Sequence, residues 1–317
     1  MATQSLAEAA KLIRNDLVRG VAEDIIDLNP WFAELRMDSM EGQSVTVPRE
    51  ASLGTAQVLA VGSAITAKAA ATFNDTDAVF QPTKIIGDAE LDDLVRATSA
   101  SAGTDQAAIE IASKAKSVGR TFQQGIATGT GVMPQINSLH SLVYSGQYTT
   151  SAPTGQALSF ILLDEMMDLV LSKHGIVDWI QMPARTIRSY KALLRALGGT
   201  PGDWVMNIPY ANGRERTVIT YEGTPIFKNT YLSVVETADG AALTGGAYAS
   251  VWGGVWDDGT RKVGVAAIYP KNTPVGIGVE LIGAQEEYDG RIWRVKQYTN
   301  FAVYNRRGIA RLTSINN

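Results

Sequence analysis

Carboxylates are the residues of this sequence best suited to chemistry. Asp164 and Asp168 are four residues apart and Glu165 lies beside them, so a helix would place all three on one face. Two carboxylates are enough for acid and base catalysis in glycoside and aspartyl hydrolases. Because Lys173 follows closely and no other catalytic residue type accompanies them, a solvated acidic helix face is the favoured interpretation.

Two other acidic runs have the character of turns. Residues 286–290 (EEYDG) and residues 257–259 (DDG) both end in Asp-Gly. This dipeptide is typical of tight connections between strands, so we interpret both runs as charged turns. A hydrolase that uses Asp164, Asp168 or Glu286 stays an alternative, although no constellation of residues supports it.

The sequence contains few residues that could support histidine or cysteine chemistry. The sequence has no cysteine and two histidines, His140 and His174. Disulfides, thiolate nucleophiles and zinc ribbons are therefore excluded, and the lack of cysteine fits a reducing cytoplasm. His174 precedes Gly175 at a predicted helix end, where it would bond the last carbonyls. His140 lies beside Ser141 in a predicted loop, which favours a solvated or bridging role.

No nucleotide or serine-hydrolase motif is present. The glycine-rich run 125–131 (GIATGTG) follows a predicted helix, whereas a phosphate-binding loop follows a strand and carries Gly-Lys-Ser/Thr, which this sequence lacks. No Gly-x-Ser-x-Gly elbow occurs either. We therefore predict no enzyme, no cofactor, and no catalytic, cofactor-binding or metal-ligating residue.

Charge is distributed unevenly along the chain. The formal net charge is -4, which argues against a dedicated nucleic-acid binder. The sequence from Arg291 onward nevertheless contains no acid, and strand alternation would place Arg294 and Lys296 on one face. That face could meet acidic neighbours or a polyanion, and pairing with acidic neighbours is the favoured interpretation. The basic residues of this stretch are Arg291, Arg294, Lys296, Arg306, Arg307 and Arg311.

The N-terminal half predicts long helices around a weakly apolar excursion. Apolar residues three or four apart indicate a helix over 4–28. A strand is expected at 44–48, and residues 52–82 are too poor in large apolar side chains to form a core, which indicates a projecting, loosely two-stranded arm. A strand at 83–88 and a short helix at 90–96 lead into a helix of about 35 Å capped by Thr104-Asp105. Its predicted buried stripe is Ala108, Ile111, Ala115, Val118, Phe122 and Ile126.

The C-terminal half predicts a mixture of helices and strands. Residues 155–173 indicate a helix, 175–180 a buried strand, and Pro183 opens a third helix whose apolar residues recur at Ile187, Tyr190, Leu194 and Leu197. Strands are then expected at 215–221, 224–235, 247–256, 262–270, 275–282 and 291–304. Helices interspersed with mostly antiparallel strands define an α+β fold class.

The order of these elements resembles the major capsid proteins of tailed bacteriophages, which have the Hong Kong 97-type capsid fold. Residues 80–94 (FQPTKIIGDAELDDL) are similar to that family's return from an extended loop, and 125–134 (GIATGTGVMP) to its exit from the spine helix. Residues 283–315 are similar to the closing strand of that family and to the return of its chain to the second domain. The sequence shows no signal peptide and no apolar stretch approaching the roughly 20 residues of a membrane span.

The resemblance implies a domain layout and a function. Residues 1–29 would form an N-terminal arm, 30–52 the P-domain entry, 53–84 the extended E-loop and 85–133 the P-domain with its spine helix. The A-domain would be 134–258, with P-domain strands at 259–304 and a return to the A-domain at 305–317. We expect pentamers and hexamers of an icosahedral shell around double-stranded DNA, located in the virion capsid and assembled in the bacterial cytoplasm.

The implied partners are further copies of the chain, packaged DNA held by non-specific contacts, a separate scaffold protein, a portal and possibly decoration proteins, but no membrane. Met1 together with the short arm favours a separate scaffold over a removed one.

Lys68 lies in the predicted E-loop, but nothing identifies an acceptor, so no crosslink is predicted. Alternatives are an encapsulin-like cargo shell, the carboxylate hydrolase, and a tail or tube protein that stacks rings.

Overall fold

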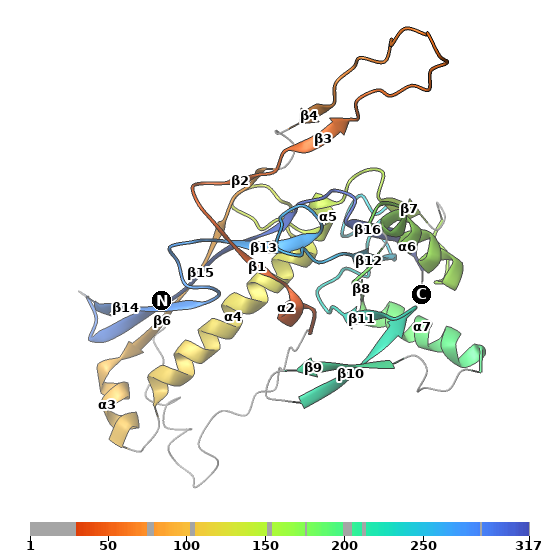
Figure 1. Cartoon of the computed structure of the whole chain (residues 1–317). Coiled ribbons are helices and arrows are strands. Elements are labelled where there is room, and N and C mark those ends of the chain that lie inside the picture. Colours follow the sequence, from red (N-terminus) through yellow and green to blue (C-terminus); the bar gives the residue numbers. More distant parts are fainter. Residues whose placement is uncertain are drawn as a thin grey trace.

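The computed structural model describes residues 30–74, 79–101, 105–150, 154–174, 176–198, 205–210, 214–285 and 287–316. The helix predicted over 4–28 lies outside these residues. The described chain forms two sheets, each covered by helices, and an arm that projects well away from both (Figure 1). None of the described helices has the length and apolar character needed to cross a membrane.

The first sheet is built around one long strand, β15 (Gly290–Val303). This strand pairs antiparallel with β6 (Thr83–Asp92) along one edge, and with β14 (Gly278–Ala284) and β13 (Val265–Pro270) as further neighbours. The parallel strand β1 (Met37–Met40) completes the sheet beside β13. The predicted strand 83–88 therefore continues to Asp92, because its ladder with β15 runs that far, and the helix that follows is α3 (Asp93–Ser101).

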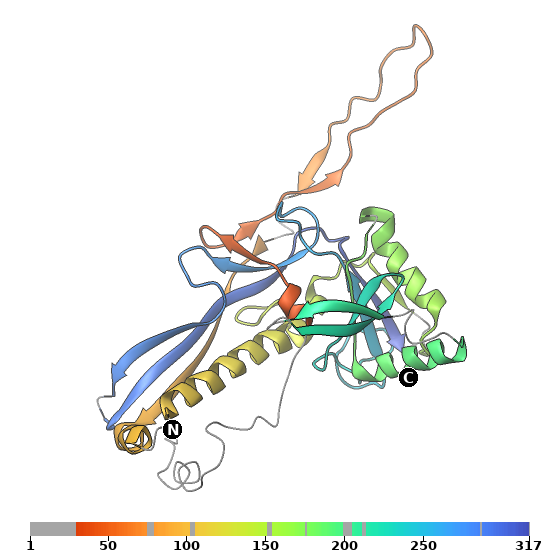
Figure 2. The same cartoon turned by 60° about the horizontal axis from the view of Figure 1, so that its bottom comes forward.

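The spine helix is confirmed as α4 (Gln106–Thr128), which lies across β6 and β15 (Figure 2). Asp105 caps it by accepting a hydrogen bond from the Ala108 amide at 3.1 Å. The predicted stripe is right for its C-terminal half, where Val118, Phe122 and Ile126 are buried. It is wrong at Ala108, which is exposed, because the adjacent Ala107 is the residue that packs against Leu91 and Val95.

The second sheet has the order β7-β16-β12-β8-β11-β10-β9. Helices α6 (Phe160–His174) and α7 (Ala184–Ala196) share an apolar core with it. The short helices of the chain are α2 (Pro30–Glu34) and α5 (Leu139–Leu142). The strands of this sheet are β7 (Tyr148–Thr150), β8 (Trp179–Met182), β9 (Val205–Tyr210), β10 (Arg214–Tyr221), β11 (Thr224–Lys228), β12 (Ala249–Gly254) and β16 (Ile309–Ile315).

Several predicted boundaries in this half are wrong. The helix predicted from 155 begins at Phe160, and the strand predicted at 175–180 lies at Trp179–Met182, with Ile176 exposed. The strand predicted over 224–235 ends at Lys228, where pairing with β8 stops. Strands β1, β7, β9 and β16 were not predicted from the sequence. The ends of these strands are set by hydrogen-bonded partners that lie far away in the sequence. The local spacing of apolar residues therefore could not predict where the strands begin and end.

The projecting arm is confirmed. Its base consists of two short antiparallel pairs, β2 (Val45–Thr46) with β5 (Val79–Phe80), and β3 (Arg49–Ser52) with β4 (Thr72–Asn74). The loop 53–71 continues outward without regular strands (Figures 1 and 2). The chain therefore holds its two sheets in one body and extends a thin loop beyond it.

Candidate functional site: exposed apolar surfaces

The acids considered for catalysis do not form an enclosed pair in the part of the chain described. Asp164, Glu165 and Asp168 are all exposed on α6, as the solvated helix face predicts. Asp164 accepts a hydrogen bond from the Tyr221 hydroxyl, and burial together with this bond raises the pKa of Tyr221. Glu286 lies outside the described residues. No group of three or more His, Cys, Asp or Glu side chains within the described ranges could hold a metal ion.

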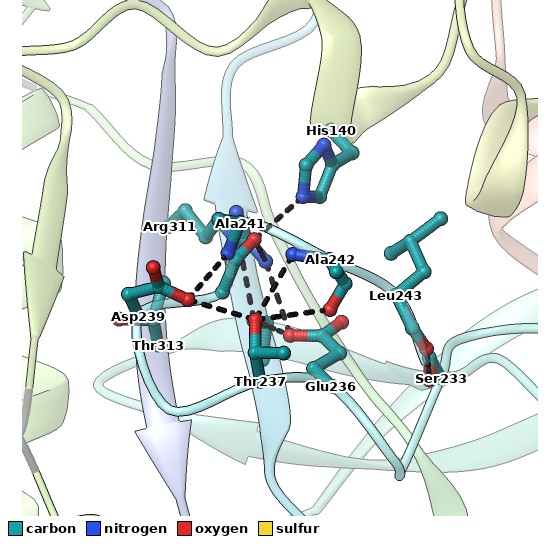
Figure 3. A network of polar contacts seen from close by, with 12 residues as sticks. His140, Ser233, Glu236, Thr237, Asp239, Ala241, Ala242, Leu243, Arg311 and Thr313 are labelled. Carbon is teal, nitrogen blue, oxygen red and sulfur yellow. Dashed lines mark hydrogen bonds and ion pairs between the residues drawn. The ribbon is translucent and has the colours of Figure 1, made fainter. Parts of the chain in front are cut away.

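His140 has the second of the two roles considered for it, a bridging role, but it lies on a short helix and not in the predicted loop. It lies on α5, and its Nε2 is 2.7 Å from the carbonyl oxygen of Gly240 in the loop before β12 (Figure 3). A capping box between Ser138 and Ser141 fixes the short helix that carries it. His174 is the last residue of α6, and the role predicted for its side chain stays a prediction.

Arg311, expected among the basic residues of the C-terminal stretch, is buried in a polar network (Figure 3). Its Nη2 donates to Glu236 Oε2 and to the Gly240 carbonyl, each at 3.0 Å, and its Nε donates to Ser250 Oγ at 3.1 Å. The Arg311 guanidinium also lies over the ring of Trp252. This network ties the loop that contains residues 236–240 to β12 and β16.

The remaining basic residues of the long strand meet acidic neighbours. Arg294 makes a two-pronged ion pair with Asp88, with both contacts at 2.9 Å, and the hydrogen bond from Arg294 lowers the pKa of Asp88. Lys296 pairs with Glu280, and its hydrogen bond lowers the pKa of that carboxyl. The favoured interpretation of this face is confirmed, and its charges are neutralised within the chain. Arg291 pairs with Asp93, Arg306 lies over the Tyr144 ring, and Arg307 is exposed.

The other motifs considered for chemistry have structural roles. At Gly125 a Cβ would come within 2.6 Å of the Ile136 side chain, so glycine allows the end of the spine helix to pack closely. Asp257 accepts hydrogen bonds from the amides of Gly259 and Arg261, and Gly259 has φ +101° against the Arg36 guanidinium. Residues 257–259 thus form a turn held by the Asp257 side chain, but the predicted tight connection between strands is wrong, because β12 and β13 belong to different sheets.

The arm leaves its apolar side chains uncovered. Val58 and Val61 have relative exposures of 103% and 107%, and Leu53, Ile65 and Phe73 are also largely exposed. Among the described residues, no other layer of the chain packs against these side chains. Contiguous exposed apolar surface of this kind marks an interaction site in a folded protein.

A second apolar surface lies along β14. Val279 is paired with Val295 of β15, and Leu281 with Trp293. Paired residues lie on the same face of a sheet, and on β15 this face is covered by α4. Helix α4 leaves this part of β14 largely uncovered, since Val279 is 50% and Leu281 54% exposed. We call this surface the β14 shelf; it consists of Val279 and Leu281.

No family model and no curated protein sequence matches this chain. Solved structures match it closely in fold. The holo-SrpI encapsulin complex from Synechococcus elongatus PCC 7942 has a TM-score of 0.72 at 13% identity, over 100% of this chain and 97% of that one. The cyanophage A-1(L) capsid has a TM-score of 0.70 at 13% identity, over 97% and 98%. The native GTA particle capsid has a TM-score of 0.66 at 12% identity, over 99% and 100%.

These likenesses extend over nearly the whole length of each protein, so they concern the complete architecture. The fold is an α+β capsid fold with a projecting loop, a spine helix and two sheets. More particularly, it is the Hong Kong 97-type fold that the order of elements predicted.

Proposed function

We propose that this chain is the major capsid protein of a tailed bacteriophage, whose copies assemble as pentamers and hexamers into an icosahedral shell around double-stranded DNA. One observation carries the proposal: the arm exposes apolar residues that its own chain does not cover, in a fold shared with capsid proteins. Neighbouring copies would supply the missing cover.

The domain layout expected from the sequence belongs to this proposal. Residues 53–84 would act as the E-loop, with the P-domain around α4 and β15 and the A-domain around the seven-stranded sheet. Packaged DNA, a separate scaffold, a portal and decoration proteins are the proposed partners. The virion capsid is the proposed location, with assembly in the host cytoplasm.

A cargo-enclosing shell is the second candidate, because an encapsulin shares the fold over the full length of this chain. The two functions differ in what the particle contains. Nuclease-resistant DNA inside purified particles would support the virion, whereas a defined protein cargo without DNA would support the encapsulin-like shell. A persistent monomer or small oligomer would contradict both.

The proposal is tested by shortening the arm where the structure allows it. The Thr55 amide donates to the Ala69 carbonyl at 3.0 Å, so residues 56–68 can be replaced by Asn-Gly while both arm pairs remain. We expect a folded chain that no longer forms closed shells by electron microscopy and light scattering. A full-length variant with Val58, Val61 and Ile65 changed to serine separates loss of apolar surface from loss of length. Normal shells from both variants would contradict the proposed role of the arm.

A further inference from the structure

The outer face of α6 carries two acidic side chains, Glu165 and Asp168, without an ion-pair partner among the described residues. Leu163, Met166 and Val170 point into the core, which leaves Glu165 and Asp168 exposed on the opposite side. Neither carboxylate has an ion pair or side-chain hydrogen bond with any described residue. The acidic face first considered for catalysis is therefore open to another molecule.

The outer face of α7 has the opposite charge. Its sequence ARTIRSYKALLRA contains four basic residues and no acid. Tyr190 anchors the helix by donating to the Thr220 carbonyl at 2.9 Å, and Arg188, Lys191 and Arg195 are exposed. These three cations also lack an ion pair within the described ranges. They differ in this respect from Arg291, Arg294 and Lys296 of the long strand, all of which are paired.

The two helices share one apolar core on the same sheet, where the Phe160 ring of α6 lies 6.1 Å from the Tyr190 ring of α7. Helix α6 packs against β16, β12 and β7, whereas α7 is fastened to β10 by Tyr190 (Figure 1). Each copy thus presents an acidic helix face and a basic helix face on one layer. A ring of identical subunits needs two different, complementary patches of this kind, because each copy contacts its two neighbours through unlike surfaces.

We propose that the acidic face of α6 in one copy contacts the basic face of α7 in the next copy of the ring. This inference rests on the proposed shell function and assigns residues to one of its contacts. Glu165 and Asp168 are three residues apart, as are Arg188 and Lys191, so each pair spans about 4.5 Å along its helix axis. Two cations can therefore face two anions in register.

Charge complementarity favours a second copy over nucleic acid as the occupant of α7. A polyanion that bound Arg188 and Lys191 would leave the acidic face of α6 unexplained and would be repelled by it. A neighbouring copy accounts for both faces at once. Such contacts at the edge of an interface set register and association rate more than affinity, and salt weakens them.

The test exchanges charges between the two faces. We expect E165K/D168K to lower the rate of shell formation on the order of tenfold, because like charges then meet across the contact. R188E/K191E should do the same for the same reason. Combining all four substitutions restores the attraction and the wild-type net charge, so assembly should recover to within about threefold of wild type. Shell formation is followed by light scattering, and thermal unfolding of each unassembled variant checks that it folds.

A matched control changes the same number of acids elsewhere. E287K/D289K alters two exposed carboxylates in the turn before β15 and should assemble like the wild type. An equal loss of assembly in this control would overturn the contact in favour of a net-charge effect, as would failure of the four-substitution variant to recover. Normal shells of R188E/K191E with less packaged DNA would assign α7 to nucleic acid, again overturning the contact but leaving the proposed shell function intact.

Discussion

The guanidinium of Arg311 and the carboxylate of Glu236 lie 3.0 Å apart, and their side chains are only 5% and 2% exposed. Burying two ions is costly, so the pair is stable only because Ser250 and the Gly240 carbonyl satisfy further hydrogen bonds. Removing one partner would leave the other charge buried without compensation. At the scale of single residues, we therefore expect the described chain to be sensitive to substitution of either member of this pair.

We predict that Glu236→Gln lowers the free energy of unfolding by about 3 kcal/mol, because Arg311 keeps its charge and loses its counter-ion. Urea denaturation of the unassembled protein measures this loss. E236M/R311M removes both charges and should recover most of the stability, since no buried ion remains. If the unfolding free energy of E236Q were within about 0.5 kcal/mol of the wild-type value, the buried pair would not be what holds the loop of residues 236–240.

The sequence alone did not reveal this network. Arg311 follows other basic residues in a stretch without acids, which suggests a surface position, and its partner lies 75 residues away. By contrast, the exposed acids of α6 were predicted correctly, and a bridging role was one of the two considered for His140. Local spacing places a side chain on one face of a helix, but it contains no information about which distant element covers that face.

At the scale of elements, the loop of the arm is shaped by side chains instead of a strand ladder. Gln57 Oε1 accepts hydrogen bonds from the Thr66 amide at 3.1 Å, the Ala67 amide at 2.5 Å and the Thr66 hydroxyl at 2.7 Å. Thr55 Oγ1 accepts another from the Ala69 amide. A loop ordered before it meets a partner loses less conformational entropy on binding.

We predict that Gln57→Ala raises amide hydrogen exchange at Thr66 and Ala67 about fivefold in the unassembled protein, because a hydrogen bond worth about 1 kcal/mol is lost. Shell formation should slow as well, since the loop must now be ordered during docking. Gln124→Ala, at an exposed position on α4, is the control and should change neither quantity. Unchanged exchange in Q57A would show that the side chain does not order the loop.

Helices and strands were predicted correctly where the residues that define their ends lie close together in the sequence. The spine helix was found because Asp105 caps it and its apolar residues recur at helical spacing, and α7 because Pro183 precedes it. Strand β8 was misplaced because its ends follow from pairing with β11 and β12, which come more than 40 residues later. The arm was found for a different reason: its composition could not supply a core.

At the scale of the whole molecule, the core of the chain and the proposed contacts between copies involve different residues. One apolar cluster, around Trp31 and Trp179, draws side chains from both sheets, and a second lies beneath α6 and α7. The arm and the β14 shelf belong to neither cluster. We therefore expect substitutions on these surfaces to affect the proposed assembly without affecting folding.

The β14 shelf allows this separation to be measured. We predict that Leu281→Ser changes the unfolding free energy of the unassembled chain by no more than about 0.5 kcal/mol, because over half of that side chain already contacts solvent. In a shell every copy would repeat the lost contact, so the protein concentration needed for assembly should rise severalfold. Leu163→Ser, at a fully buried position, is the opposite control and should unfold the chain itself. If L281S assembled at the wild-type concentration, the shelf would not be a contact between copies, and the arm would be left as the apolar surface on which assembly depends.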